Sequence, residues 1–218
     1  MSINRRNFVS KLGIGAITTL TVTKAVASEA CNFLPTPEQP LGPFYPKTMP
    51  EDTNVDLTRV SGRSMSAKGE VIIVTGIVQD EDCRPVKGAI VEIWQACKSG
   101  KYNHPSDTSN NVLDPNFQYY AQVRTNRRGE YSFKTIFPGA YDATSTWTRP
   151  PHIHYKISLR GFEELVTQLY FKGEKLNKYD RILQKLNKDD RNEVVIDLEK
   201  DTRSGTRTGN FNIKLKRL

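Results

Sequence analysis

Short stretches of alternating apolar and polar residues recur along most of this chain, and turn-forming residues separate them. Apolar side chains at every second position are typical of β-strands that bury one face. We therefore expect strands at Glu70–Gln79, Gly88–Ala96, Tyr119–Thr125, Gly129–Thr135, His152–Leu159, Leu165–Phe171 and Asn210–Leu218. Many short strands separated by turns predict an all-β fold, specifically a two-sheet β-sandwich.

Two segments depart from this alternation. Lys178–Lys188 groups Ile182, Leu183 and Leu186 at helical spacing, so we expect one helix there. Residues 31–70 are rich in Pro, Thr and Asp with no sustained period, which predicts an irregular N-terminal arm. We divide the chain into a signal segment (1–27), the arm (28–70) and a sandwich domain (71–218).

The first 27 residues have the order of an export signal. Arg5 and Arg6 precede a mildly apolar run from Leu12 to Val22, and Ala25-Val26-Ala27 offers a small-residue cleavage site. This order is typical of twin-arginine signals. The apolar run is shorter than the roughly 20 residues needed to cross a bilayer. We therefore expect a periplasmic or extracellular protein without stable membrane insertion.

The net charge does not indicate a nucleic-acid partner. The chain of 218 residues carries a formal charge of +8, and residues 1–27 contribute four basic residues and no acid, so a mature chain would carry +4. No basic stripe is interleaved with aromatic residues.

Three cysteines would enter an oxidising compartment after export. Cys83 and Cys97 lie at opposite ends of one predicted strand, too far apart to bond. Any internal disulfide must therefore include Cys31, and three free thiols are the alternative.

Two of the three histidines, His152 and His154, are two residues apart in a predicted strand. Residues at this spacing project from the same face, so both imidazoles can reach one metal ion. Tyr102 and Tyr141 stand at the starts of two long polar loops, where binding groups are often found. Phenolate oxygen beside imidazole suits ferric iron better than zinc or copper. The sequence thus predicts an Fe(III) site.

Six separate motifs carry a family resemblance over roughly residues 35–218. In order and spacing the chain resembles the intradiol ring-cleavage dioxygenases, and among them the β subunit of protocatechuate 3,4-dioxygenase. The motifs are Val91–Ala96, Gly100–His104, Leu113–Phe117, Phe137–Tyr141, Arg149–His154 and Gln168–Phe171.

The resemblance implies a non-haem Fe(III) centre whose ligands are Tyr102, Tyr141, His152 and His154. It implies cleavage of a protocatechuate-like catechol by O₂, between the two hydroxyl-bearing carbons, to a cis,cis-muconate-type diacid. Tyr141 would leave the metal when the catechol binds and take up a substrate proton. Arg149 would place a positive charge beside the ring, and Gln168 would be a polar neighbour.

The chain departs from the family pattern at two places. Asp142-Ala143 follows Tyr141 where the family usually has proline and tryptophan, and Leu41 replaces an acid in Leu41-Gly42-Pro43-Phe44-Tyr45-Pro46. In protocatechuate enzymes an α subunit completes the pocket, so we expect either a homo-oligomer or an α-type partner.

Two alternatives remain open at this point. A non-enzymatic prealbumin-like binding module would share the sandwich motifs but would not need the two histidines and two tyrosines. A zinc or copper site would combine His104 with the histidine pair. We expect Trp94 in the core rather than in the site, and His104 at the edge of the pocket or at the surface.

Overall fold

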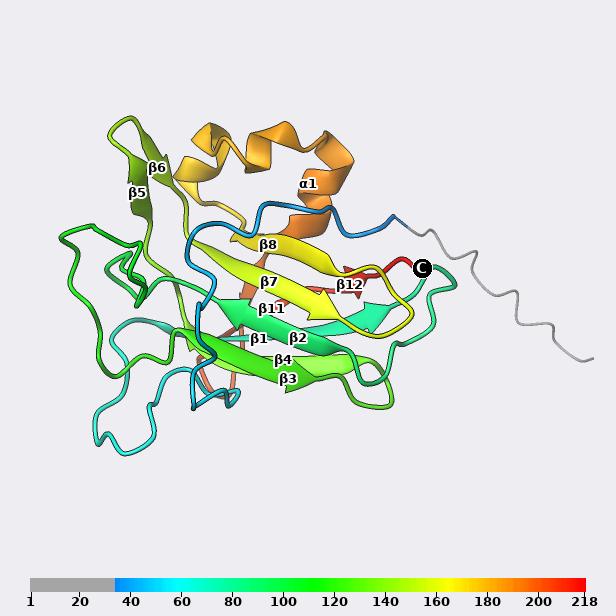
Figure 1. Cartoon of the computed structure of the whole chain (residues 1–218), viewed down its shortest axis with the longest axis horizontal. Helices are drawn as coiled ribbons and strands as arrows, with labels where there is room; N and C mark the ends of the chain where they lie inside the picture. The colour runs from blue at the N-terminus through cyan, green and yellow to red at the C-terminus, as the bar shows by residue number, and fades with distance from the viewer. Residues whose placement is uncertain (1–33) are drawn as a thin grey trace, which may run out of the picture. The chain divides into compact units, whose positions relative to one another are not determined.

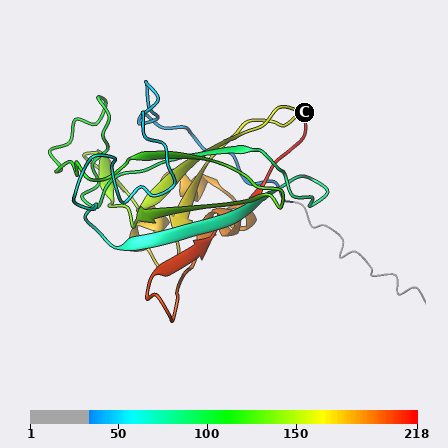
Figure 2. The ribbon, with the colours of Figure 1, turned by 90° about the horizontal axis from the view of Figure 1, so that it is seen from below.

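Two five-stranded sheets pack face to face in the part of the chain that the structure describes. The computed structural model describes residues 34–218. One sheet contains β10 (Leu198–Lys200), β11 (Arg207–Asn210), β1 (Val71–Gln79) and β12 (Ile213–Lys214), with β4 (Glu130–Ile136) paired to β1. The other has the order β3 (Tyr120–Arg124), β2 (Ile90–Trp94), β7 (His152–Ser158), β8 (Leu165–Phe171) and β9 (Val195–Ile196). Figures 1 and 2 show the sheets as two layers, which confirms the predicted sandwich.

The alternation of β1 shows why the sheets pack together. Ile72, Val74 and Val78 are fully buried, while Ile73, Thr75 and Ile77 are only partly buried. On the facing sheet, Ile153 and Ile157 of β7 belong to the same hydrophobic core. Each sheet therefore contributes one apolar face to a single interior.

Glycine lets β1 meet the C-terminal segment closely. A Cβ atom on Gly76 would lie 1.9 Å from the carbonyl oxygen of Phe211. Phe211 donates its N–H to the Thr75 carbonyl at this point. β11 pairs with residues 72–75 of β1, and β12 pairs with residues 78–79. Any side chain at position 76 would push the strands apart.

The predicted helix at Lys178–Lys188 is wrong. The segment forms two short 3₁₀ turns, η1 (Lys175–Tyr179) and η2 (Leu183–Lys185), and the only α-helix within residues 34–218 is α1 (Lys188–Val194). Asp180 lies between the two turns and accepts hydrogen bonds from the N–H groups of Ile182 and Leu183. This local bonding competes with a continuous helix.

The C-terminal strand is shorter than expected, and the loop at Tyr141–Thr148 is more regular. Of the predicted strand Asn210–Leu218, only Asn210, which ends β11, and β12 (Ile213–Lys214) lie in strands. Phe211, Ile213 and Leu215 are nevertheless all buried, as the alternation predicted. Tyr141–Thr148 lies almost wholly in a hairpin of β5 (Tyr141–Thr144) and β6 (Trp147–Arg149). The short strands β9, β10 and β11 were not predicted.

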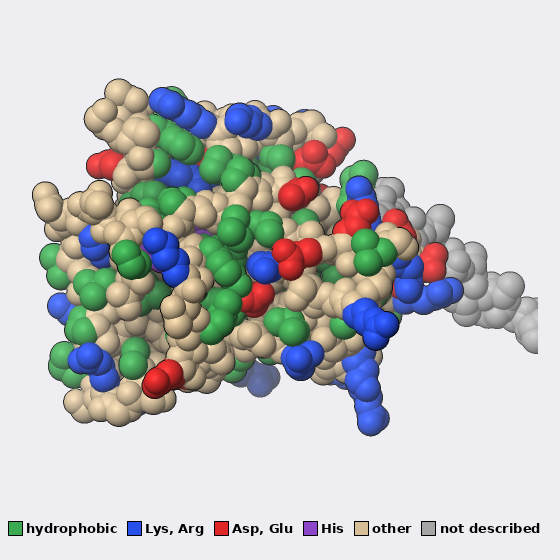
Figure 3. All heavy atoms as spheres, viewed as in Figure 1, with side chains coloured by type: hydrophobic (Ala, Val, Ile, Leu, Met, Phe, Trp, Pro, Cys, Tyr) green, Lys and Arg blue, Asp and Glu red, His purple; other side chains and the backbone are tan. Residues whose placement is uncertain are grey.

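Residues 34–70 contain no strand longer than an isolated bridge. The start of this arm lies along β8, where the Gln39 N–H donates to the Val166 carbonyl (Figure 1). Its later part lies beside β3 and β4, where Thr53 accepts from the Gln122 N–H and Asp56 forms a bridge with Lys134. The export signal and Cys31 lie outside the described residues. Within 34–218, no helical segment is long and apolar enough to cross a membrane. On the face drawn in Figure 3, basic side chains are scattered among acidic and apolar ones.

Candidate metal centre and substrate cavity

His152 and His154 project from the outer face of β7. The intervening Ile153, with Tyr155 and Ile157, points into the core between the sheets, so the two histidines point the other way. Both imidazoles are nevertheless almost completely buried. The outer face of the strand is therefore covered, and the two side chains lie in an enclosed polar site.

Neighbouring strands place three more side chains on this face. Trp94 of β2 and Gln168 of β8 lie opposite His154, and Tyr170 of β8 lies opposite His152. The indole of Trp94 stacks on the imidazole of His154, with ring centroids 4.9 Å apart and planes 9° apart. The antiparallel register of β2, β7 and β8 therefore builds one wall of the site.

The hydrogen bonds of His152 fix which nitrogen is free. Its Nδ1 lies 2.6 Å from the Pro150 carbonyl oxygen, which can only accept, so Nδ1 carries the proton and Nε2 has a lone pair. The Nε2 atoms of His152 and His154 face each other at 3.2 Å. Burial first, and then the charge of Arg149, hold the pKa of both imidazoles well below the ordinary range. Both rings are therefore neutral, the form that binds metal ions.

Two glycines bring Tyr102 and Tyr141 together. A Cβ atom on Gly100, whose φ is +82°, would lie 2.1 Å from the carbonyl oxygen of Ala140, and one on Gly139 would lie 2.4 Å from the Gly100 nitrogen. The two loops thus touch backbone to backbone just before each tyrosine. The phenol rings pack edge to face with centroids 5.4 Å apart.

Both phenols lie beside the histidines. The ring centroid of Tyr102 is 6.3 Å from that of His154, and the centroid of Tyr141 is 5.6 Å from that of His152. The Tyr102 hydroxyl is buried and has no hydrogen-bond partner among residues 34–218. Burial, then the proximity of Tyr141, raises the pKa of Tyr102 well above its ordinary value. Burial also raises the pKa of Tyr141, although the charge of Arg149 partly opposes this.

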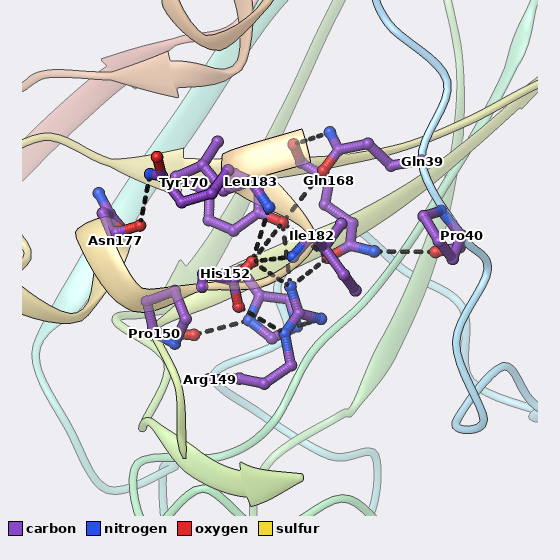
Figure 4. A network of polar contacts seen from close by, with 12 residues as sticks. Gln39, Pro40, Arg149, Pro150, His152, Gln168, Tyr170, Asn177, Ile182 and Leu183 are labelled. Atoms are coloured by element: carbon purple, nitrogen blue, oxygen red, sulfur yellow. Dashed lines mark hydrogen bonds and ion pairs between the residues drawn. The ribbon is translucent and has the colours of Figure 1, made fainter. Parts of the chain in front are cut away.

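Arg149 links the histidines to a buried network of polar groups (Figure 4). Its Nε donates to Asp180 Oδ2 at 2.9 Å. Its Nη2 donates to Gln168 Oε1 at 2.9 Å and to the Tyr170 hydroxyl at 3.0 Å. Its Nη1 lies 3.1 Å from His152 Nε2. The side chains of Arg149 and Asp180 are 3% and 0% exposed. The ion pair holds a positive charge at the edge of the site where water is excluded.

The N-terminal arm is tied to this network. The Gln168 side chain donates to the Pro40 carbonyl at 2.8 Å, and Gln39 donates to the Gln168 carbonyl at 2.9 Å. The Tyr170 hydroxyl donates to Gln39 Oε1 at 3.0 Å. These contacts hold the arm against β8 and supply the cover over the outer face.

The next residues of the arm close the site itself. Gly42 has a φ of +77°, and a Cβ atom there would lie 3.0 Å from His154 Cε1. Phe44 stacks on Tyr102 with centroids 4.3 Å apart. The Tyr45 hydroxyl then donates to the buried carboxylate of Glu92 at 2.8 Å.

A cavity of about 660 Å³ opens from this centre towards the surface. Tyr141 and Arg149 line it on the inside, Phe44 bounds it from the arm, and the hairpin β5–β6 and residues 106–111 form its outer walls. A molecule in this cavity can reach both a phenol and the guanidinium of the centre.

His104 is not a third imidazole of this centre. Residues 34–218 contain no group of three or more His, Cys, Asp or Glu side chains arranged to hold a metal ion. His104 Nδ1 accepts a hydrogen bond from the Ser106 N–H, and its ring lies at the edge of Phe44. A site made of three histidines is therefore not present, and the remaining donor set combines two imidazoles with two phenols.

Sequence comparison identifies the family. A family model described as Dioxygenase matches residues 41–217. The chain belongs to the intradiol ring-cleavage dioxygenase family. Over 133 residues this family member is 43% identical to the protocatechuate 3,4-dioxygenase β chain of Burkholderia cepacia, an alignment that covers 59% of the present chain and 56% of the relative. Family membership favours the enzyme hypothesis over the binding-module alternative.

Solved structures of other dioxygenases have the same fold. The dioxygenase domain of a carbohydrate-binding fusion protein from Streptomyces sp. SirexAA-E is 27% identical with a TM-score of 0.64, covering 84% of the present chain and 99% of that chain. Catechol 1,2-dioxygenase from Acinetobacter sp. ADP1 is 25% identical with a TM-score of 0.65, covering 84% of the present chain and 63% of that one. The present chain spans about half the length of the curated relatives that it matches, such as 47% of catechol 1,2-dioxygenase from Acinetobacter baylyi.

The fold of the chain brings all six predicted site residues together. They are Tyr102, Tyr141, Arg149, His152, His154 and Gln168, and every one is buried. Their chemical roles stay predictions. Arg149 and Gln168 both lie in one buried network, so neither side chain is at the surface.

Sequence reasoning missed two residues of the site. Asp180 was assigned to a helix, and the only signal for it was indirect, because a buried arginine requires a counter-charge. Trp94 was expected in the core rather than in the site; it is buried as expected, but it stacks on His154 and therefore also belongs to the site. Trp94 and Glu92 are two residues apart on one strand, so they lie on the opposite face from Val91 and Ile93. This spacing could have placed Trp94 on the outer face with His154.

Proposed function

We propose that this protein is an Fe(III)-dependent intradiol dioxygenase that cleaves a catechol ring between its two hydroxyl-bearing carbons with O₂ and yields a muconate-type diacid. The observation that carries the proposal is the convergence of two neutral imidazoles and two phenols in one buried site. The unpartnered Tyr102 hydroxyl and the facing Nε2 atoms of the histidines support a metal ion bound between these side chains. Tyr102, Tyr141, His152 and His154 would hold the iron.

This donor set fits a trivalent ion. Burial keeps both phenols protonated unless a nearby cation stabilises the phenolates, and the imidazoles are neutral without assistance. Two phenolates would match most of the charge of Fe³⁺. When bound, ferric iron supplies the Lewis acidity that favours the catecholate and allows the electron-rich ring to react with O₂.

Tyr141 is the tyrosine placed to move a proton. It lines the substrate cavity, whereas the Tyr102 ring is covered by Phe44. The charge of Arg149 favours its phenolate. We infer that the Tyr141 oxygen takes a proton from one catechol hydroxyl as the substrate binds.

Arg149 supports this exchange and the later charge development. Its guanidinium lines the cavity and is fixed by Asp180, Gln168 and Tyr170, so it needs no reorientation during the reaction. We infer that it stabilises negative charge on the ring. Gln168 acts by positioning, because its oxygen accepts from Arg149 and its nitrogen anchors Pro40.

The substrate we propose is protocatechuate-like, that is, a catechol with a ring substituent remote from the two hydroxyls. The 43% identity to a protocatechuate 3,4-dioxygenase β chain supports this choice. We further propose export through the twin-arginine pathway, and assembly as a homo-oligomer or with an α-type subunit. Mass spectrometry of the secreted protein would test whether residues 1–27 are removed, and light scattering would measure the assembly.

The test of the function is iron content measured together with the visible spectrum. Tyrosinate bound to Fe(III) absorbs in the visible, so the iron-loaded protein should be coloured, and anaerobic catechol should shift the band. Tyr102→Phe and Tyr141→Phe should each weaken the band. Tyr120→Phe is the matched control, since Tyr120 lies in the same aromatic cluster but donates to Glu92. A colourless protein after reconstitution with iron would rule out the tyrosinate centre.

A further inference from the structure

We propose that the ring substituent of the proposed catechol substrate is bulky, uncharged and hydroxyl-rich, and that it replaces the carboxylate that protocatechuate carries at the same distance from the two hydroxyls. The inference rests on the proposed dioxygenase function and deepens it. Three features of the cavity carry it: its size, the chemistry of its outer wall and the balance of charge around it.

The cavity is much larger than one ring. Its volume is about 660 Å³, whereas a cavity of about 150 Å³ is sufficient to hold benzene in another protein. The catechol ring must approach Tyr141 and Arg149 at the inner end, so roughly three quarters of the space remains beyond it. Cavities of about 300–1,000 Å³ typically bind ligands of several rings.

The inner part of that remaining space has apolar walls. Pro43 and Phe44 of the arm, Ala143 and Trp147 of the hairpin, and Ile182 line it. Ala143 has a small side chain, which leaves room here. The indole of Trp147 offers a flat surface on which a second ring or the apolar face of a sugar can pack.

The outer wall consists of neutral hydroxyl and amide groups from two loops. The side chains are those of Ser106, Thr108, Asn110, Asn111, Thr144 and Ser145. Those of Ser106, Thr108, Asn110 and Asn111 form no hydrogen bond within residues 34–218. Each can donate and accept, which matches the hydroxyl groups of a ligand without any need for charge.

The charges around the cavity disfavour a carboxylate on the substituent. Arg149 is paired with Asp180, and Asp107 is paired with Lys101 at 3.1 Å. Asp142 on β5 accepts a hydrogen bond from the Thr148 hydroxyl and has no basic partner among the described residues. A substrate carboxylate would therefore meet an uncompensated negative charge at the rim.

Arg181 is the residue that would bind a substrate carboxylate, which is the alternative to a neutral substituent. Its guanidinium lies 5.3 Å from the centre of the Trp147 ring and is exposed, but the side chain is not part of the cavity wall. If the natural substituent were a carboxylate, Arg181 would be the cation within reach of it.

The experiment compares three substrates on the iron-loaded full-length protein by O₂ uptake. They are catechin as the bulky neutral catechol, 4-methylcatechol as the small neutral one and protocatechuate as the acid. We expect kcat/KM for catechin to exceed that for protocatechuate by at least about tenfold, because like charges oppose binding of the acid. Asp142→Asn should raise the protocatechuate to 4-methylcatechol ratio of kcat/KM several-fold.

A second variant tests the outer wall. The double substitution Asn110→Ala, Asn111→Ala should lower the ratio of kcat/KM for catechin to that for 4-methylcatechol, mainly through KM. A preference for protocatechuate that Arg181→Gln abolishes would overturn the inference and leave the dioxygenase function intact. Absence of O₂ uptake with all three catechols would overturn the proposed function itself, and the inference with it.

Discussion

Removal of the charge of Asp180 should destabilise the protein strongly. The carboxylate is fully buried and accepts from Arg149 Nε at 2.9 Å and Nη2 at 3.2 Å. It also accepts from the backbone N–H groups of Ile182 and Leu183 at 3.1 Å and 2.8 Å. Asp180→Asn keeps the shape of the side chain but leaves the guanidinium with an uncompensated charge.

The expected cost follows from desolvation. Loss of one partner of a buried ion pair costs about 3–5 kcal/mol, because the remaining charge stays out of water. For a protein of this size each kcal/mol lowers Tm by about 2–4 °C, so Tm should fall by roughly 6–20 °C. The hydrogen bonds from Arg149 to Gln168 and Tyr170 would remain in the variant, but these neutral side chains provide dipoles and no negative charge.

Urea-induced unfolding measured without iron isolates this effect, because metal binding would add its own stabilisation. Asp197→Asn is the matched control. Asp197 pairs with Lys172 at 2.8 Å, but the two side chains are 59% and 69% exposed. Water and salt screen such a pair, so no measurable change is expected.

An Asp180→Asn variant that unfolds within about 1 kcal/mol of the wild type would refute the reasoning. Such a result would mean that the neutral partners of Arg149 are sufficient to hold the buried guanidinium, and that the site does not depend on the ion pair.

Three further predictions concern the cover, the cation and the pH response. Gly42→Ala should reduce iron retention, because the new Cβ atom would lie 3.0 Å from His154 Cε1. Gly62→Ala is the control: Gly62 has a similar φ of +79°, but its Cβ atom would have no atom within 4 Å, so this variant should retain iron normally. Arg149→Lys should lower kcat more than it raises KM, since lysine cannot keep the forked pairing, and equal effects would contradict a role in the transition state. Burial raises the pKa of Asp80, but the N–H donors and the arginine that contact it outweigh burial and lower the pKa overall. Its contribution to stability is therefore present above about pH 4 and lost below it. Between about pH 5 and pH 3 the wild type should lose more unfolding free energy than Asp80→Asn, and parallel losses would contradict this.

The sequence by itself determined the strands and the histidine pair. Alternation with a period of two is a local property, so Leu165–Phe171 was located to the residue and the sandwich followed from the series of strands. The same period placed His152 and His154 on one face. Tyr102 and Tyr141 could be selected because their type suits a metal, and the family resemblance added Arg149 and Gln168.

Only the tertiary structure decided what surrounds these residues. Gln39 bonds to Gln168 from 129 positions away, and Asp180 meets Arg149 across 31 positions. Such contacts depend on how the arm and the 3₁₀ turns cross the sheet, which no local period encodes. The hairpin β5–β6 forms because its two strands pair with each other, although only the first residue of β5 and the last residue of β6 are buried, so no apolar alternation marks it. The residues that supply the proposed chemistry were therefore visible in the sequence, whereas their burial, their charge balance and the space beside them depend on the packing of distant segments.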